Sequence, residues 1–170
     1  MQLDAAHIAA NPDPQVPDGF RLRTFQPGQD EAPYIALLQS AGFAAWNEDY
    51  LQRTLHATLP EGIFFLVDNA TNALAGTAVA NRIDPNRFPD GGEFGWLAVS
   101  PAYQGRRLAR VVHDAVIRRY REEGYRKLYL LTDDFRLPAL KLYLSRGWQP
   151  IIPDDETAQR WHAIHETLKI

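Results

Sequence analysis

The sequence predicts one α/β domain in which a mixed β-sheet carries helices on both faces. Three observations predict this class. Strand-like and helix-like patterns follow one another in the order β-α-α-β-β-β-α-β-α-β. The 170 residues are 45% hydrophobic and 23% charged, an ordinary globular composition. A chain of this length can bury a core without a metal or disulfide staple. We expect the single domain over residues 20–170.

The first expected elements are a polar lead-in, a strand and two helices. Residues 1–19 contain three prolines and are expected to be extended or disordered. Residues 20–25 alternate apolar and polar side chains, which predicts a half-buried strand. Residues 30–41 carry an apolar helical stripe and end before Gly42. Asn47 can cap a second helix that runs to about residue 59.

A hairpin and a loop are expected in the middle of the chain. Residues 62–68 form an apolar run bounded by turn residues, and residues 69–72 supply a turn. Residues 73–80 can then pair back as the second strand. Residues 84–92 are rich in Pro, Asn, Asp and Gly, which predicts a loop. Residues 93–99 follow as a strand.

The last expected elements begin with a long amphipathic helix over residues 105–123, which Gly124 ends. Residues 127–132 are rich in leucine and tyrosine and predict a strand. A short helix over 137–146 and a strand over 148–152 follow. The tail 155–168 is expected to be helical or mixed.

Composition excludes several classes of function. The absence of cysteine excludes disulfides, thiolate nucleophiles and cysteine-ligated zinc. A net charge of −3 argues against a basic surface that binds nucleic acid. No apolar run approaches the ~18 residues of a membrane span. The first residues lack the basic and apolar regions of a secretory signal, so we expect a cytoplasmic protein without nucleic-acid or membrane partners. The histidines suggest no metal site, and His113 is expected on a helix surface.

Charge is nevertheless segregated along the chain. Residues 105–127 contain eight basic residues against three acidic ones, whereas residues 1–60 contain seven acidic residues against three arginines. The start of the expected long helix contains Arg106, Arg107 and Arg110. A helix N-terminus presents unpaired N–H groups and binds phosphate, and Gly105 allows a close approach of the backbone. The stretch matches neither a Walker loop nor a G-x-G-x-x-G fingerprint.

The segment Gln104-Gly105-Arg106-Arg107-Leu108-Ala109 resembles the pyrophosphate-binding signature [QR]-x-x-G-x-[GA] of the GNAT superfamily of acyl-CoA-dependent N-acyltransferases. Residues 97–101 resemble the strand before that signature. Ala139 to Tyr143, followed by Ser145 to Trp148, resembles the family's later helix and strand. The resemblance is specific over residues 93–150 and topological over 20–150. Glu93 to Trp96 and the turn 132–136 are most similar to mycothiol-synthase-like members.

This resemblance implies a GNAT fold whose central mixed sheet splays between the fourth and fifth strands, 93–99 and 127–132. Acetyl-CoA would be the acyl donor, with its pantetheine in the splay, and no metal is implied. The N–H of Val99 would polarise the acetyl carbonyl. The implied cofactor-binding residues are Leu97, Ala98, Val99, Gln104, Gly105, Arg106, Arg107, Leu108, Ala109 and Arg136.

Two residues depart from the family pattern. Arg107 stands where the signature has glycine. Its Cβ would restrict the approach of the pyrophosphate to the backbone, while its guanidinium would add a positive charge. Arg136 stands where many members have an asparagine that contacts CoA. It can meet a phosphate or face solvent.

Two residues are the candidates for acid–base chemistry. Glu93 resembles the family's base position, and a carboxylate can accept an amine proton through one water. Strand alternation would place Glu93, Gly95, Leu97 and Val99 on one face. Glu93 can alternatively be a solvent-facing acid at a strand end. Tyr143 can protonate the departing thiolate, or it can be a core aromatic.

The predicted function is transfer of an acetyl group from acetyl-CoA to a primary amine of a small molecule, by direct attack in a ternary complex. Aromatic and acidic residues over 43–50 and acids at 154–156 would favour a cationic acceptor. The alternative is a catalytically silent acyl-CoA-binding module. The protein is expected to be a monomer or a homodimer.

Overall fold

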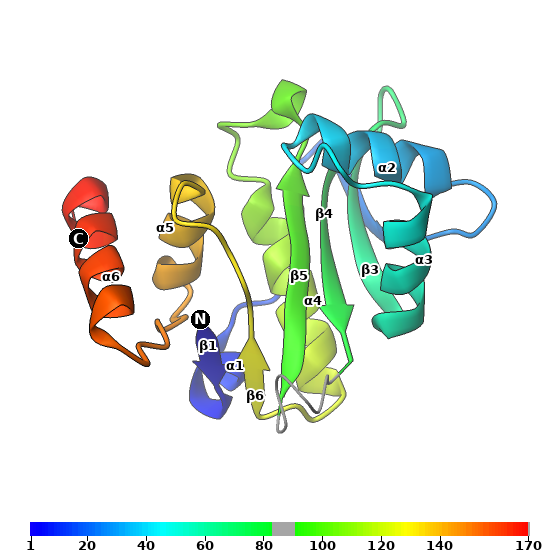
Figure 1. Ribbon diagram of the computed structural model, residues 1–170. Helices are drawn as coiled ribbons and strands as arrows, with labels where there is room; N and C mark the ends of the chain where they lie inside the picture. The colour runs from blue at the N-terminus through cyan, green and yellow to red at the C-terminus, as the bar shows by residue number, and fades with distance from the viewer. Residues whose placement is uncertain (83–90, 170) are drawn as a thin grey trace.

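The computed structural model describes residues 1–82 and 91–169. Its centre is a six-stranded mixed sheet in the order β1-β6-β5-β4-β3-β2 (Figure 1). The strands are β1 (Gln2–Asp4), β2 (Phe20–Thr24), β3 (Thr58–Asp68), β4 (Leu74–Asn81), β5 (Gly92–Val99) and β6 (Lys127–Tyr129). The helices are α1 (Ala5–Ala10), α2 (Glu31–Ser40), α3 (Glu48–Ala57), the short 3₁₀ helix η1 (Pro101–Tyr103), α4 (Ala109–Glu122), α5 (Leu137–Ser145) and α6 (Asp155–Leu168).

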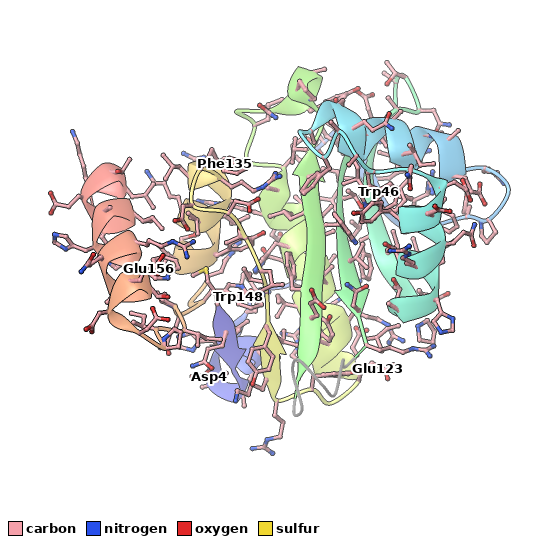
Figure 2. All side chains as sticks on the ribbon, in the orientation of Figure 1. Asp4, Trp46, Glu123, Phe135, Trp148 and Glu156 are labelled. Atoms are coloured by element: carbon pink, nitrogen blue, oxygen red, sulfur yellow. The ribbon has the colours of Figure 1, made fainter. Side chains whose placement is uncertain are left out.

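Helices cover both faces of the sheet, as the sequence predicts. One face packs against α4 and α1 through a core that includes Val112, Ile117 and Trp148. The other face packs against α2 and α3 through a core that includes Tyr34, Trp46 and Phe65. Figure 2 shows Trp46 among α2 and α3, and Trp148 on the other side of β5 beside β1. The sheet is thus buried on both sides, which explains its continuous apolar runs.

Most expected elements are present, with shifted ends. Asn47 caps α3 by accepting a hydrogen bond from the N–H of Tyr50, which confirms the expected cap. The helix expected from residue 105 begins at Ala109, because η1 and a turn occupy the preceding residues. The strand expected over 148–152 is reduced to a single bridge between Gln149 and Gln2. The expected loop 84–92 falls mostly outside the described residues.

The beginning of the chain differs from its expected extended or disordered state. Residues 2–4 form β1, which pairs antiparallel with β6, and residues 5–10 form α1, which Asp4 caps. Residues 2–4 are extended, as expected, but the edge of β6 orders them into a paired strand. The expectation was wrong for residues 5–10, where the Asp4 cap and the buried Ile8 stabilise a helix. Within the described residues, no helix is long and apolar enough to cross a membrane.

The sheet splays between β5 and β6, as the resemblance implies. These parallel strands pair only at Gly92 with Leu128 and at Glu93 with Tyr129. β5 then continues to Val99 beside β4, while the chain after β6 turns away toward α5 (Figure 1). Within the described residues, positions 94–99 of β5 therefore have no strand neighbour on the β6 side.

A bulge divides β5 into two halves. Gly95 pairs with Val79 and Ala98 pairs with Thr77, so β5 has one extra residue between these pairs, and Trp96 adopts a φ of 48°. The extra residue reverses the alternation of side chains. Glu93 and Gly95 lie on the face of α2 and α3, whereas Leu97 and Val99 pack toward α4. The expectation that all four share one face was wrong for this reason.

Candidate active site

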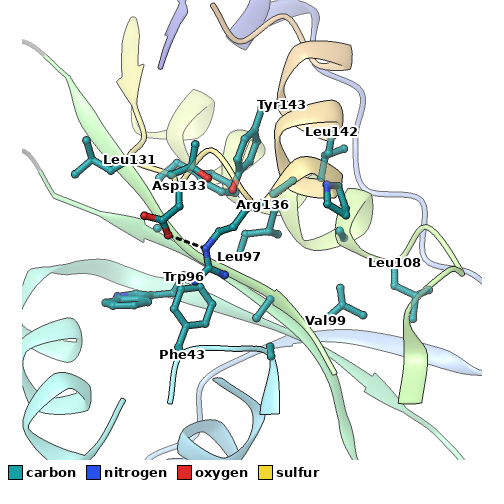
Figure 3. A pocket seen from close by; sticks show the side chains of 18 of the residues that line it. Phe43, Trp96, Leu97, Val99, Leu108, Leu131, Asp133, Arg136, Leu142 and Tyr143 are labelled. Atoms are coloured by element: carbon teal, nitrogen blue, oxygen red, sulfur yellow. Dashed lines mark hydrogen bonds and ion pairs between the residues drawn. The ribbon is translucent and has the colours of Figure 1, made fainter. Parts of the chain in front are cut away.

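A cavity of about 1150 Å³ opens where β5 and β6 diverge. Its walls come from β5, the turn before α4, α5 with its preceding loop, and α3 with the loop before it (Figure 3). It contains 11 of the 12 site residues that the sequence predicts: Glu93, Leu97, Ala98, Val99, Gln104, Gly105, Arg107, Leu108, Ala109, Arg136 and Tyr143. The structure therefore brings together residues that are up to fifty positions apart in the chain.

Arg106 is the predicted residue that does not line the cavity. Its guanidinium carbon lies 4.9 Å from the ring centroid of Phe20 and 5.9 Å from that of Tyr103. Stacking on these rings holds the side chain of Arg106 away from the cavity.

The turn before α4 forms a cradle of backbone donors. No described residue accepts a hydrogen bond from the N–H groups of residues 105–108. Gly105 has a φ of 77° and Arg107 a φ of 60°. Such left-handed residues next to a helix N-terminus can direct successive N–H groups toward one anion. The cradle therefore fits a phosphate, and Arg107 adopts the strained conformation that the signature's glycine adopts without cost.

Tyr143 lies on α5 with its ring inside a box of aromatic side chains. Its ring centroid is 5.9 Å from that of Phe94 and 6.1 Å from that of Trp148, both edge-on. Burial raises the pKa of the Tyr143 phenol above its ordinary value, and the positive charge of Arg136 opposes that rise. The sequence left two interpretations of Tyr143 open, a core aromatic and a residue of the site. The structure is compatible with both, because the Tyr143 side chain is mostly buried and also lines the cavity.

Glu93 is half-buried at the base of the cavity, in the part of β5 that still pairs with β6. Its backbone is held from the other side of the sheet. The hydroxyl of Tyr120 lies 2.7 Å from the carbonyl oxygen of Glu93 and 2.8 Å from that of Asn81, so α4 fixes β4 and β5 together at this point.

The wall opposite α5 is built by Phe43, Tyr50, Arg53 and Thr54, which we call the α3 wall. Trp46 stacks edge-on behind it against Trp96, with ring centroids 5.6 Å apart, and is buried. Glu48, Asp49 and residues 154–156 do not line the cavity. The expected acidic acceptor side is therefore absent from the described lining.

Several polar lining residues and one buried histidine were missed by the sequence analysis. Asn81 and Asp133 both line the cavity; Asn81 lies in no motif, and Asp133 lies in the turn 132–136 but was assigned no role in the site. His113 was expected on the surface but is completely buried. A signal for its burial existed, since His113 precedes Val116 and Ile117 by three and four positions on the apolar stripe of the helix. Within the described chain, no group of three or more His, Cys, Asp or Glu side chains could hold a metal ion.

Comparison with known proteins agrees with this geometry. Residues 31–148 match the model of the acetyltransferase (GNAT) family. A mycothiol acetyltransferase of Saccharomonospora viridis is 31% identical over 160 residues, which cover 87% of this chain and 52% of that protein. The chain thus spans about half the length of the curated relatives it matches.

Solved structures share the fold. A tandem GNAT protein from the clavulanic acid biosynthesis pathway superposes with a TM-score of 0.68 at 21% identity, over 88% of this chain and 48% of that one. A GNAT family acetyltransferase from Elizabethkingia anophelis, solved with acetyl-CoA bound, has a TM-score of 0.63 at 19% identity, over 80% of both chains. Since the family model covers well over half of the sequence, this chain belongs to the acetyltransferase (GNAT) family.

Proposed function

We propose that this protein transfers an acetyl group from acetyl-CoA to a primary amine of a small molecule, by direct attack while both substrates are bound. One observation carries the proposal. A single cavity is lined by Gly105, Arg107 and Leu108 of the N–H cradle together with Glu93 and Tyr143. The cradle would hold the pyrophosphate, and Leu97 to Val99 would pair with pantetheine along the part of β5 that has no β6 partner.

The proposed step forms one bond and breaks one bond. The amine nitrogen attacks the acetyl carbonyl carbon, and the carbon–sulfur bond breaks. Glu93 accepts the proton of the amine through a water molecule, and Tyr143 donates its proton to the departing thiolate. The N–H of Val99 would stabilise the developing oxyanion. The absence of cysteine excludes an acyl-cysteine intermediate, which favours direct transfer.

The relatives support a small-molecule acceptor. Several proteins about 30% identical to this chain are named mycothiol acetyltransferases. Their acceptor is therefore the first compound to test here, although this chain matches only about half of each relative.

The test is release of free CoA thiol with acetyl-CoA and a panel of primary amines, including the acceptor of the mycothiol acetyltransferases. For acceptors without a thiol, a thiol reagent reports this release without background from the protein, because the protein has no cysteine. For an acceptor that itself carries a thiol, the acetylated product is measured by mass spectrometry instead. We expect turnover with at least one amine. Acetyl-CoA binding in a calorimeter with no turnover on any amine would instead establish the silent acyl-CoA-binding module.

A further inference from the structure

The side chain of Arg136 crosses the cavity from α5 to the α3 wall. Its guanidinium carbon lies 4.1 Å from the ring centroid of Phe43, which packs edge-on against Trp96 with ring centroids 5.5 Å apart. Figure 3 shows the guanidinium over Phe43 beside Trp96, with Tyr143 above it and Leu108 on the far side of the view. The charge of Arg136 thus lies beside Phe43 and Trp96, level with the middle of β5 and away from the cradle at residues 105–108.

The hydrogen bonding of this guanidinium is incomplete. Its Nε donates to Oδ2 of Asp133 at 3.0 Å. No described residue accepts a hydrogen bond from Nη1 or Nη2, although only 22% of the side chain is exposed. The ring of Phe43 covers a face of the guanidinium and leaves its in-plane N–H groups unpaired.

These unpaired donors constrain what can fill the cavity. Water satisfies them while the cavity is open. A substrate that displaces this water must supply acceptor oxygens, because an unpaired charged donor is costly when it is desolvated. The two Nη groups form a planar fork, and a carboxylate matches such a fork with two parallel hydrogen bonds.

Resting on the acetyl-transfer function proposed above, we propose that Arg136 is a specificity residue that binds a carboxylate at the acyl-transfer end of the cavity. The carboxylate belongs either to the amine acceptor, as in an amino acid, or to the acyl chain of the donor. Glu93 lies on the face of β5 that is turned toward the α3 wall, so an acceptor with both an amine and a carboxylate finds a partner of opposite charge for each. This role differs from the CoA contact that the family resemblance implies for Arg136.

The test compares matched substrates in native protein, Arg136→Gln and Arg136→Lys. One arm compares an amino acid with its amide, using acetyl-CoA. The other arm compares succinyl-CoA with acetyl-CoA, using the amide. We expect at least about a tenfold preference in kcat/KM for the acidic member of one arm. Arg136→Gln should abolish that preference by lowering kcat/KM for the acidic substrate alone, and Arg136→Lys should restore it only in part because lysine lacks the fork.

Arg160→Gln is the matched control. Arg160 pairs with Asp134, next to Asp133 in the same loop, and lies outside the cavity. This variant should keep the native preference. Equal rates within both pairs would overturn the proposal. The proposal would also be overturned if Arg136→Gln lowered kcat/KM equally for every substrate and raised the KM for acetyl-CoA. That result would show that Arg136 binds acetyl-CoA.

A second measurement separates this proposal from the proposed function. If no amine is acetylated, calorimetry on CoA-loaded protein compares an N-acetyl amino acid with its amide. Tighter binding of the acid in native protein but not in Arg136→Gln supports the carboxylate site without turnover. Equal binding of acid and amide in native protein contradicts it.

Discussion

Trp148 donates its indole N–H to Nε2 of His113 across 3.0 Å, inside the core between α4 and the end of α5. An indole nitrogen can only donate, so Nε2 accepts and the proton of the neutral ring lies on Nδ1. Nδ1 then donates to Asp114 at 2.9 Å, and Asp114 accepts a second bond from Arg146 at 2.6 Å. This chain of hydrogen bonds fastens the helix that carries Tyr143 to the helix that follows the N–H cradle.

We expect the stability of the protein to fall as the pH drops below about 6.5. Burial lowers the pKa of His113, and Asp114 opposes this shift only partly. The unfolded chain therefore binds a proton that the folded protein does not, so the free energy of unfolding decreases with falling pH, by up to about 1.4 kcal/mol per pH unit for one proton. Denaturant unfolding at pH 7.5 and 5.5 measures this loss.

His113→Gln tests the assignment of that proton. The variant should be less stable at pH 7.5 and should lose less stability between pH 7.5 and 5.5 than the native protein. The exposed His162 provides the control, because His162→Gln should keep the native pH dependence. An unchanged pH dependence in His113→Gln would show that other groups cause it.

Tyr143→Phe should lower kcat about 100-fold and change the acetyl-CoA dissociation constant less than about twofold. The ring keeps its edge-on contacts with Phe94 and Trp148, while the proton donor is removed. Because the pKa of Tyr143 is raised, the hydroxyl should stay protonated, and native kcat should not decline between pH 8 and about 10 through loss of this acid. Tyr34→Phe, on the buried face of α2 and outside the cavity lining, should leave kcat unchanged. Equal turnover in the Tyr143 variant would remove its catalytic role.

Gly105→Val should weaken acetyl-CoA binding at least about tenfold. Its φ of 77° strains any residue with a Cβ, and the change is expected to cost about 1–2 kcal/mol of stability and to distort the cradle. Gly28→Val is the matched control, because Gly28 has a φ of 81° and equally open surroundings. Both variants should lose similar stability, and only Gly105→Val should lose affinity in calorimetry. Equal affinities would place the pyrophosphate elsewhere.

Tyr120→Phe should lower the free energy of unfolding by about 1–3 kcal/mol. The variant removes the hydroxyl that lies against the carbonyl oxygens of Asn81 and Glu93, and neither carbonyl can reach water in its place while Tyr120 is fully buried. Denaturant unfolding at neutral pH measures the loss. A stability equal to that of the native protein would show that the hydroxyl does not hold β4 and β5 together.

The elements that carry the candidate site could be predicted from local pattern. The strand, turn and helix around Gln104 to Ala109 follow from a change of hydrophobic period and a glycine, whereas the roles expected for these residues and for Tyr143 came from the resemblance to the GNAT family. Features that depend on contacts between residues far apart in the chain could not be predicted. The bulge at Trp96 is visible only in the pairing of β5 with β4, and the contact of Arg136 with Phe43 joins two loops. Strand β1 has only three residues and exists because β6 offers an edge.

The bulge at Trp96 also bears on how such a protein can diverge. Substitutions at Glu93 and Gly95 alter the side of β5 that is turned toward the α3 wall, whereas substitutions at Leu97 and Val99 alter the side turned toward α4. Substitutions in one half of the strand therefore leave the face presented by the other half unchanged. Deletion of the one extra residue would restore strict alternation along β5 and turn one half of the strand to the opposite face of the sheet while the other half keeps its place.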